Sequence, residues 1–322
     1  MSKIDKINPL TTLLRNEFAE DALKQRLDKA ILPLKTYSRW VCYSDYCFGD
    51  PHKPNNSISF VLMPFKSEAD YQYAQDYIKT NQPKDLKAVK RVNSKFLSFI
   101  KKQDIIVFAF ILDDFVKWLG DDTESIKEGI KANLELYQKQ FDTWSKAATS
   151  SEMQKFYQSI SSQIAGIRSA RIRKTELNTY TELLLVAVIG AVVMHQVASR
   201  LDRVDILGWF SDRDDIVNKA QGLVCNIFHS TLFCLLQQDF TFATYREDST
   251  VKPFFDHFNR ISDIITGTLA DFDVTKNTVS KPKFGKVFQK YFADNPSLFV
   301  HRLKFGEHIQ FSDILISLNK PE

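Results

Sequence analysis

Residues 37–65, YSRWVCYSDYCFGDPHKPNNSISFVLMPF, predict two β-strands joined by a turn-rich loop. Residues 37–46 and 58–65 are rich in the aromatic and β-branched residues that favour strands. The nine letters between the strands, FGDPHKPNN, are dense in turn formers, so an antiparallel pair is expected. Asp45 lies where the first strand runs out. Its carboxylate is therefore expected at the sheet edge, either starting the turn or facing a cation.

Strands and helices alternate along the rest of the chain, which indicates an α/β protein. Further strands are expected at residues 104–112, 203–210, 240–245 and 298–305, the last as a late edge strand. Helices are expected at residues 1–36, 67–80, 84–101, 180–201, 214–236 and 254–273. Residues 114–178 are polar with a helical pattern and indicate a helical insertion. The predicted organisation is an N-terminal helical segment, residues 1–36, followed by one domain, residues 37–322.

Composition bounds the class of protein. The chain has 322 residues, 44% of them hydrophobic, and a net charge of +4, which permits nucleic-acid binding without requiring it. Four cysteines lack the spacing of a zinc or redox motif, so reduced thiols in a cytoplasmic protein are expected. The apolar run LLLVAVIGAVVM, residues 183–194, is shorter than the roughly 20 residues that span a bilayer. It predicts a buried helix, and no membrane partner is expected.

Acidic residues at the ends of predicted core elements point to a divalent-metal site. Asp212 follows the strand at 203–210, and Asp214 and Asp215 come shortly after it. The alternative role of Asp212 or Asp214 is to cap the next helix. Asp263 lies in the helix at 254–273, where a solvated helix face is the alternative. Mg²⁺ and Mn²⁺ prefer such hard oxygen ligands, and a two-ion site can hydrolyse a phosphodiester. The candidate catalytic and metal-binding residues are Asp45, Asp212 and Asp263, with Asp214 as a further metal ligand.

Two basic clusters could contact phosphates. One runs along the helix expected at 84–101, and the other lies in RSARIRK, residues 168–174. Cations of this kind neutralise phosphates and make binding sensitive to salt, although solvated helix faces carry the same residues. The candidate nucleic-acid-binding residues are Lys87, Lys90, Arg91, Arg171 and Arg173, with Lys87 expected to face the site.

The order of elements over most of residues 37–273 resembles the ribonuclease H-like fold. More narrowly, the chain is similar to a largely uncharacterised prokaryotic branch of that superfamily. In that branch the first strand typically ends Asp-Glu-Ser-Gly, and the last core helix reads Ala-Asp-x-x-Ala-Gly. Here the first motif reads Ser44-Asp45-Tyr46-Cys47-Phe48-Gly49, and the second reads Ser262-Asp263-Ile264-Ile265-Thr266-Gly267.

The resemblance implies a mixed five-stranded sheet flanked by helices and a Mg- or Mn-dependent nuclease acting on DNA or RNA. It further implies a role in mobile elements or antiviral defence. Tyr46 stands where the branch usually has Glu, which removes one potential metal ligand. A second hypothesis is therefore a catalytically degenerate nucleic-acid-binding or assembly subunit. A third is a protein–protein interaction module that uses the insertion at 114–178.

Overall fold

The predicted strand pair forms the centre of the molecule. A computed structural model describes residues 8–211, 216, 219–244 and 255–317. In it β1 (Arg39–Cys47) and β2 (Asn56–Pro64) run antiparallel, with Trp40 opposite Pro64 and Cys47 opposite Ser57. β3 (Ile106–Asp113) pairs antiparallel with the far side of β2. These three strands form a continuous meander.

The sheet is mixed and larger than the sequence predicted. Its order is β5-β4-β1-β2-β3-β8-β9, so the described sheet has seven strands. The five strands implied by the ribonuclease H-like resemblance are too few, and the six segments expected from the sequence miss one. β4 (Ile206–Ser211) and β5 (Thr241–Thr244) continue the sheet in parallel from β1, and β8 (Leu298–Lys304) lies parallel to β3. The expected late strand is thus internal, because β9 (Gln310–Ile314) pairs with its outer side. β9 was not predicted because its sequence, QFSDI, is mainly polar and lacks a clear strand pattern.

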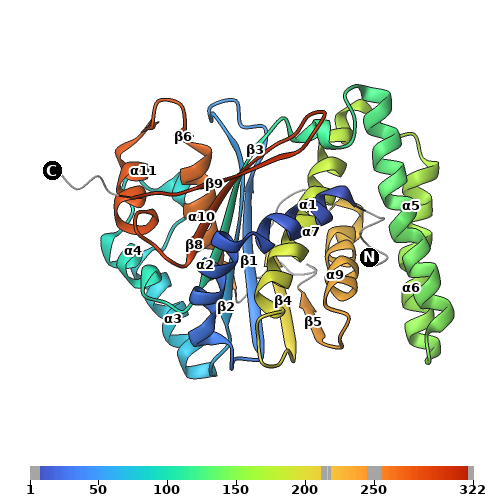
Figure 1. The fold of residues 1–322 in the computed structure, drawn as a ribbon, viewed down its shortest axis with the longest axis horizontal. Coiled ribbons are helices and arrows are strands. Elements are labelled where there is room, and N and C mark those ends of the chain that lie inside the picture. The colour runs from blue at the N-terminus through green and yellow to red at the C-terminus, as the bar shows by residue number, and fades with distance from the viewer. Residues whose placement is uncertain (1–7, 212–215, 217–218, 245–254, 318–322) are drawn as a thin grey trace.

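Helices cover both faces of the sheet (Figure 1). On one face lie α1 (Pro9–Ala19), α2 (Asp21–Ile31), α7 (Leu177–Ala198) and α9 (Leu223–Leu236). On the other lie α3 (Glu68–Asn81), α4 (Ser94–Lys101), α10 (Asp256–Ala270) and α11 (Pro282–Val287), the last continued by the π-helical turn η6 (Phe288–Phe292). A short hairpin, β6 (Phe272–Asp273) and β7 (Thr278–Val279), follows α10. Each face has its own hydrophobic core.

The apolar run at 183–194 is a core helix, as predicted. Among the described residues, α7 with the turn before it is the one segment long and apolar enough to cross a membrane, but 89% of its most apolar window is buried inside the protein. A Cβ on Gly190 would come within 2.8 Å of Phe60 and 2.9 Å of Phe228. Glycine therefore lets α7 pack closely between β2 and α9.

The insertion forms a helical hairpin at one end of the molecule (Figure 1). It comprises α5 (Thr123–Ala147) and α6 (Ser151–Ser169), and leads into α7. Asp122 and Ser125 form a capping box at the start of α5. The Tyr137 hydroxyl lies 3.0 Å from Thr231 Oγ1 of α9, which ties the hairpin to the core.

Three expected helices differ from those observed. In the described part of the chain, the helix expected at 214–236 is α9, which begins at Leu223 after the 3₁₀ turn η5 (Lys219–Gly222). The N-terminal segment is two helices broken at Glu20, whose extended backbone ends α1 and begins α2. The helix expected at 84–101 exists only as α4. Before α4 the chain forms a 3₁₀ turn, η2 (Leu86–Ala88), and an irregular segment. Pro83 and the later cap Asn93 separate this segment from the neighbouring helices.

Candidate functional site

Asp45 lies near the end of β1 on the face covered by α10. Side chains alternate along a strand, and Tyr43 of β1 belongs to the core under α10 whereas Cys42 belongs to the opposite core. Asp45 therefore shares the face of Tyr43, and it is half-buried. Its backbone carbonyl accepts a hydrogen bond from Thr266 Oγ1 of α10 at 3.1 Å.

A buried seam of hydroxyl groups fixes α10 over this end of the strand pair. Ser59, which is opposite Asp45 in β2, lies 2.7 Å from Thr266 Oγ1 and donates to the Ser262 carbonyl at 3.1 Å. Ser57 donates to the Thr266 carbonyl at 2.9 Å. Hydrogen bonds are directional, so this seam fixes the rotation and height of α10 against β1 and β2 more sharply than apolar packing alone.

Asp263 lies on α10 three residues before Thr266 and is half-buried. Its Oδ2 accepts a hydrogen bond from the Leu86 backbone N–H at 2.6 Å. This carboxylate thereby satisfies an orphan donor at the start of η2. Gly267 allows Leu86 to approach α10 closely, because a Cβ at residue 267 would lie 2.4 Å from Leu86 Cδ2. The glycine thus makes room for a neighbouring side chain of the protein.

The negative charges of Asp45 and Asp263 both act on the pKa of the Cys47 thiol. Burial, with smaller contributions from the negative charges of Asp50, Asp45 and Asp263, raises the pKa of this thiol to about 11, and the positive charge of Lys53 opposes the shift. Asp45 from β1 and Asp263 from α10 thus lie within electrostatic reach of one sulfur atom. Two of the three predicted carboxylates, Asp45 and Asp263, thus lie on the face of the sheet that α10 covers, and their role as metal ligands stays a prediction.

The remaining predicted acids, Asp212 and Asp214, lie outside the described residues. β4 ends at Ser211, which pairs with Ser44, the residue before Asp45. Within the described ranges no group of three or more His, Cys, Asp or Glu side chains could hold a metal ion. Asp45 and Asp263 nevertheless supply carboxylate oxygens, the donor type that Mg²⁺ and Mn²⁺ prefer.

Tyr46 points to the opposite face of the sheet. Its ring packs against the core of α7 and α9 and stacks on Phe48 at 6.3 Å. Ser211 Oγ donates to its hydroxyl at 2.8 Å, and Ser44 Oγ lies 2.7 Å from the same oxygen. Tyr46 therefore joins β1 to β4 and belongs to the other side of the sheet from Asp45.

The predicted basic residues occupy two separate exposed segments. Lys87, Lys90 and Arg91 lie in and after η2, close to Leu86, whose backbone N–H donates a hydrogen bond to Asp263. Arg171 and Arg173 lie between α6 and α7, and the Nε atom of Arg173 is 3.5 Å from Glu176. The first group is the one near Asp263, because Leu86, the residue before Lys87, donates its backbone N–H to the Asp263 carboxylate.

Lys283 of α11 was not predicted from the sequence. It is buried, and its ammonium group donates to the carbonyls of Leu86 at 2.7 Å and Val89 at 3.0 Å. Burial lowers its pKa, as do the positive charges of Lys281 and Lys53, while Asp263 and Asp271 raise it. Nothing in the run KPKFGK, residues 281–286, distinguishes this lysine from its exposed neighbours.

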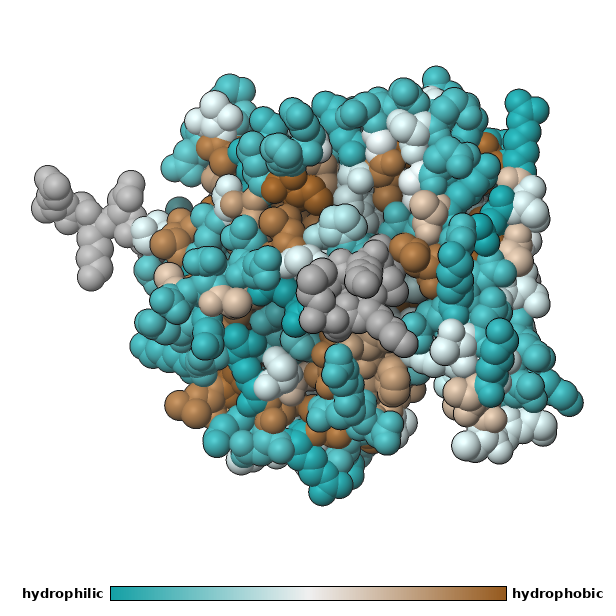
Figure 2. Space-filling model, turned by 45° about the vertical axis from the view of Figure 1, so that its right-hand side comes forward, coloured by the Kyte–Doolittle hydropathy of each residue, from teal (hydrophilic) through white to brown (hydrophobic). Residues whose placement is uncertain are grey.

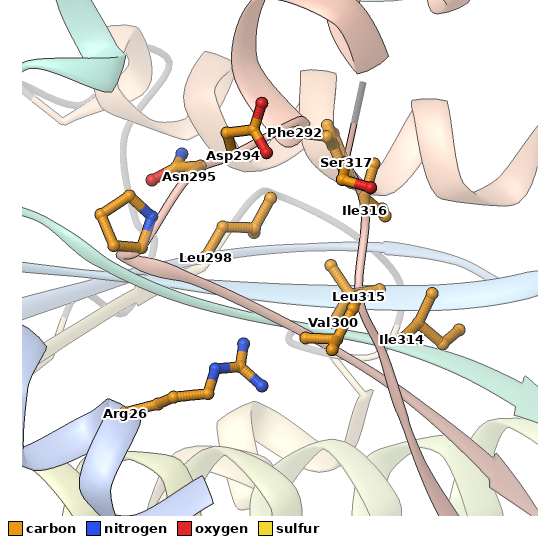
Figure 3. Close-up of a pocket in the computed structure, with 11 residues that line it drawn as sticks. Arg26, Phe292, Asp294, Asn295, Leu298, Val300, Ile314, Leu315, Ile316 and Ser317 are labelled. Carbon is orange, nitrogen blue, oxygen red and sulfur yellow. The ribbon is translucent and has the colours of Figure 1, made fainter. Parts of the chain in front are cut away.

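A separate pocket of about 390 Å³ lies at the β8–β9 edge (Figure 3). Asp294 and Asn295 stand on one side of it and Arg26 on the other, with apolar side chains such as Leu298 between them (Figure 3). Arg26 pairs with Asp313. Three strand spacings of about 4.8 Å separate β8 from β1, so this pocket is distinct from the carboxylate site. The face in Figure 2 is mainly hydrophilic, with apolar residues in scattered patches.

Comparison of the chain with protein-family models, with curated proteins and with solved structures found no match.

Proposed function

We propose that the chain is a metal-dependent nuclease built on a ribonuclease H-like core. The strand order β3-β2-β1-β4-β5 supports this, with an antiparallel meander followed by two strands parallel to β1. So does α10, a helix after β5 that returns across β1 and β2. Substrates of this class would be phosphodiesters of DNA or RNA, and a role in mobile-element or antiviral defence is part of the same proposal.

One observation carries the proposal: Asp45 of β1 and Asp263 of α10 belong to the same face of the sheet, where Thr266 of α10 bonds to the Asp45 backbone. Asp45 and Asp263 would hold Mg²⁺ or Mn²⁺, and Asp212 with Asp214 remain candidate ligands from the sequence. A bound divalent ion supplies activation of the attacking water and stabilisation of the leaving oxygen. The protein's own part is to hold the two carboxylates in register, which the hydroxyl seam of α10 does through Thr266 and Ser59.

The test is cleavage of single- and double-stranded DNA and RNA with Mn²⁺ or Mg²⁺ by the full chain. Asp45→Asn and Asp263→Asn are expected to lower cleavage by roughly 100-fold or more, since metal affinity falls by that order even when supporting residues are lost. Asparagine at 263 keeps an oxygen that can accept from Leu86 N–H, so this variant removes charge while sparing the local fold.

Asp76→Asn on α3 is the matched control, because Asp76 is exposed and is not among the candidate ligands. It should cleave like the parent. Calorimetric titration with Mn²⁺ provides a second readout, in which both site variants bind more weakly than the control. Cleavage and Mn²⁺ uptake that persist unchanged in both site variants would rule out this metal site.

A degenerate nucleic-acid-binding subunit is the second candidate function. Two observations support it. Asp263 Oδ2 already accepts a hydrogen bond from the Leu86 N–H, and Tyr46, which stands where the branch usually has Glu, faces the other side of the sheet from Asp45. This function predicts oligonucleotide binding in EDTA without cleavage in Mn²⁺. Binding that is unchanged in Asp45→Asn would then favour it over the nuclease.

A further inference from the structure

Residues 82–92 form a segment that we name the strap, and it lies across α10 and α11. Its inward side chains are buried: Gln82, Leu86 and Val92 have exposed fractions of 2%, 3% and 1%. Leu86 sits against Gly267 of α10, where a Cβ would collide with it. The strap is thus packed against the same helix that carries Asp263.

Side chains of α10 and α11 hold the strap by its backbone. Arg260 Nη1 donates to the Gln82 carbonyl at 2.6 Å, and Lys286 Nζ donates to the Val92 carbonyl at 2.8 Å. Between these ends, Asp263 accepts from Leu86 N–H while Lys283 donates to the Leu86 and Val89 carbonyls. A segment whose only regular element is the short turn η2 is therefore held at both ends and in the middle.

The outward side of the strap is basic. Four cations of the strap are exposed: Lys84, Lys87, Lys90 and Arg91. None of these four forms an ion pair with a residue that the structure describes. The one acid of the strap, Asp85, has an oxygen 3.8 Å from Arg260 Nε, so its charge is partly offset.

We infer that the strap is a preorganised binding surface, here called the rail, for the phosphate backbone of a nucleic acid bound next to Asp263. This inference rests on the proposed function and assigns its substrate contact. Charge complementarity selects a polyanion, and the fixed backbone lowers the conformational entropy lost when the cations are engaged. Arg260, Lys283 and Lys286 are positioning residues, since they hold the strap and need not touch the strand.

The first experiment measures anisotropy of a labelled single-stranded oligonucleotide at several salt concentrations in EDTA. The strap variant carries Lys84→Gln, Lys87→Gln, Lys90→Gln and Arg91→Gln. Binding is expected to weaken roughly 10-fold to 100-fold, and the slope of log K against log salt to become shallower by about 2 to 3. The matched control neutralises four exposed lysines elsewhere, Lys24, Lys29, Lys146 and Lys155. It should change both quantities much less.

The second experiment tests positioning. Lys283→Met removes the donors to Leu86 and Val89, so it should weaken binding and flatten the salt slope, and Lys283→Arg should restore both. If Lys283→Met does not fold, the strap variant alone decides, since its four changes are on the surface.

The outcomes separate this inference from the nuclease proposal. If the parent binds but the strap variant matches the control, the rail is refuted whatever the cleavage assay shows. Binding that depends on the strap without any metal-dependent cleavage keeps the rail and removes the nuclease. Binding of the parent to anionic vesicles but to no oligonucleotide would overturn the rail in favour of a lipid surface.

Discussion

The carboxylate of Asp263 accepts a hydrogen bond from the backbone N–H of Leu86, 177 residues earlier in the chain, at 2.6 Å. This contact gives one side chain two competing roles, because an oxygen that caps η2 is also an oxygen proposed to hold a metal ion. The roles can be separated, since capping needs an acceptor and metal binding needs a negative charge.

The first prediction concerns stability at Asp263. Asp263→Ala should lower the free energy of unfolding by about 1–3 kcal/mol, because the Leu86 N–H loses its acceptor. Asp263→Asn should cost clearly less, although both variants lose the charge. Urea denaturation of the parent and both variants measures the difference. Equal losses in the two variants would contradict a capping role.

The sequence predicted the centre of the sheet well, because its strands carry local signals. The run DIIVFAFIL, residues 104–112, predicts a central strand, and the structure has β3 there with a neighbouring strand on both sides. The hairpin loop at 48–55 and the apolar run of α7 were equally clear. Each of these features depends on propensities within one short segment.

The candidate site was less predictable because it depends on contacts between distant segments. The strap looked like a basic helix, yet its backbone bonds to Arg260, Lys283 and Lys286 replace helical ones. The hydroxyl seam was also missed, because Ser59 and Thr266 carry no distinguishing sequence signal. Asp45 was singled out at the end of a strand and Asp263 as an acid amid apolar residues, and their role as metal ligands stays a prediction.

The second prediction tests the hydroxyl seam. Thr266→Val replaces a buried hydroxyl by a methyl group of similar shape. It removes the side-chain hydrogen bond to the Asp45 carbonyl and the contact with Ser59 Oγ, which keeps only the Ser262 carbonyl as its partner. It should lower the free energy of unfolding by about 1–3 kcal/mol and reduce metal-dependent cleavage by shifting Asp45.

Thr268→Val on the same helix is the matched control for that substitution. Thr268 is fully buried, and its hydroxyl has no hydrogen-bond partner among the described residues. Its replacement should be neutral or stabilising, because an unsatisfied buried group is removed. Similar losses at 266 and 268 in thermal unfolding would show that the seam contributes no specific stability.

The third prediction concerns the close packing of α7. Gly190→Ala should cost about 1–3 kcal/mol, because the added methyl group meets the rings of Phe60 and Phe228. Gly166→Ala on α6 provides the contrast, since nothing lies within 4 Å of a Cβ there. That change should stabilise the helix by up to about 1 kcal/mol. Denaturation midpoints shifted in the same direction in the two variants would contradict this account.

The fourth prediction is a loss of stability in acid caused by His301. This β8 side chain is fully buried among aromatic rings, with Phe311 at 4.7 Å and Phe110 at 5.3 Å between ring centroids. Burial, together with the positive charge of Arg26, lowers the pKa of His301 to about 3. Asp313 Oδ1 lies 3.4 Å from Nδ1, but its charge does not offset the burial.

The sign follows from comparing folded and unfolded chains. Between about pH 6.5 and pH 3 the unfolded chain binds a proton at His301 that the folded protein does not, so the free energy of unfolding falls as the pH falls through this window. At pH 5 this one residue should account for about 2 kcal/mol of lost stability relative to pH 7. His195 and His229, whose pKa values burial lowers to about 4, act in the same direction.

His301→Leu should remove the contribution of that residue alone. Because neither ring nitrogen has a hydrogen-bond partner in the described structure, the variant should unfold near the parent's denaturant midpoint at pH 7. At pH 5 it should be the more stable of the two by about 2 kcal/mol, with a residual slope from His195 and His229. Urea titrations at both pH values measure this. Parallel stability profiles for parent and variant would show that His301 is protonated in the folded protein as readily as in the unfolded chain.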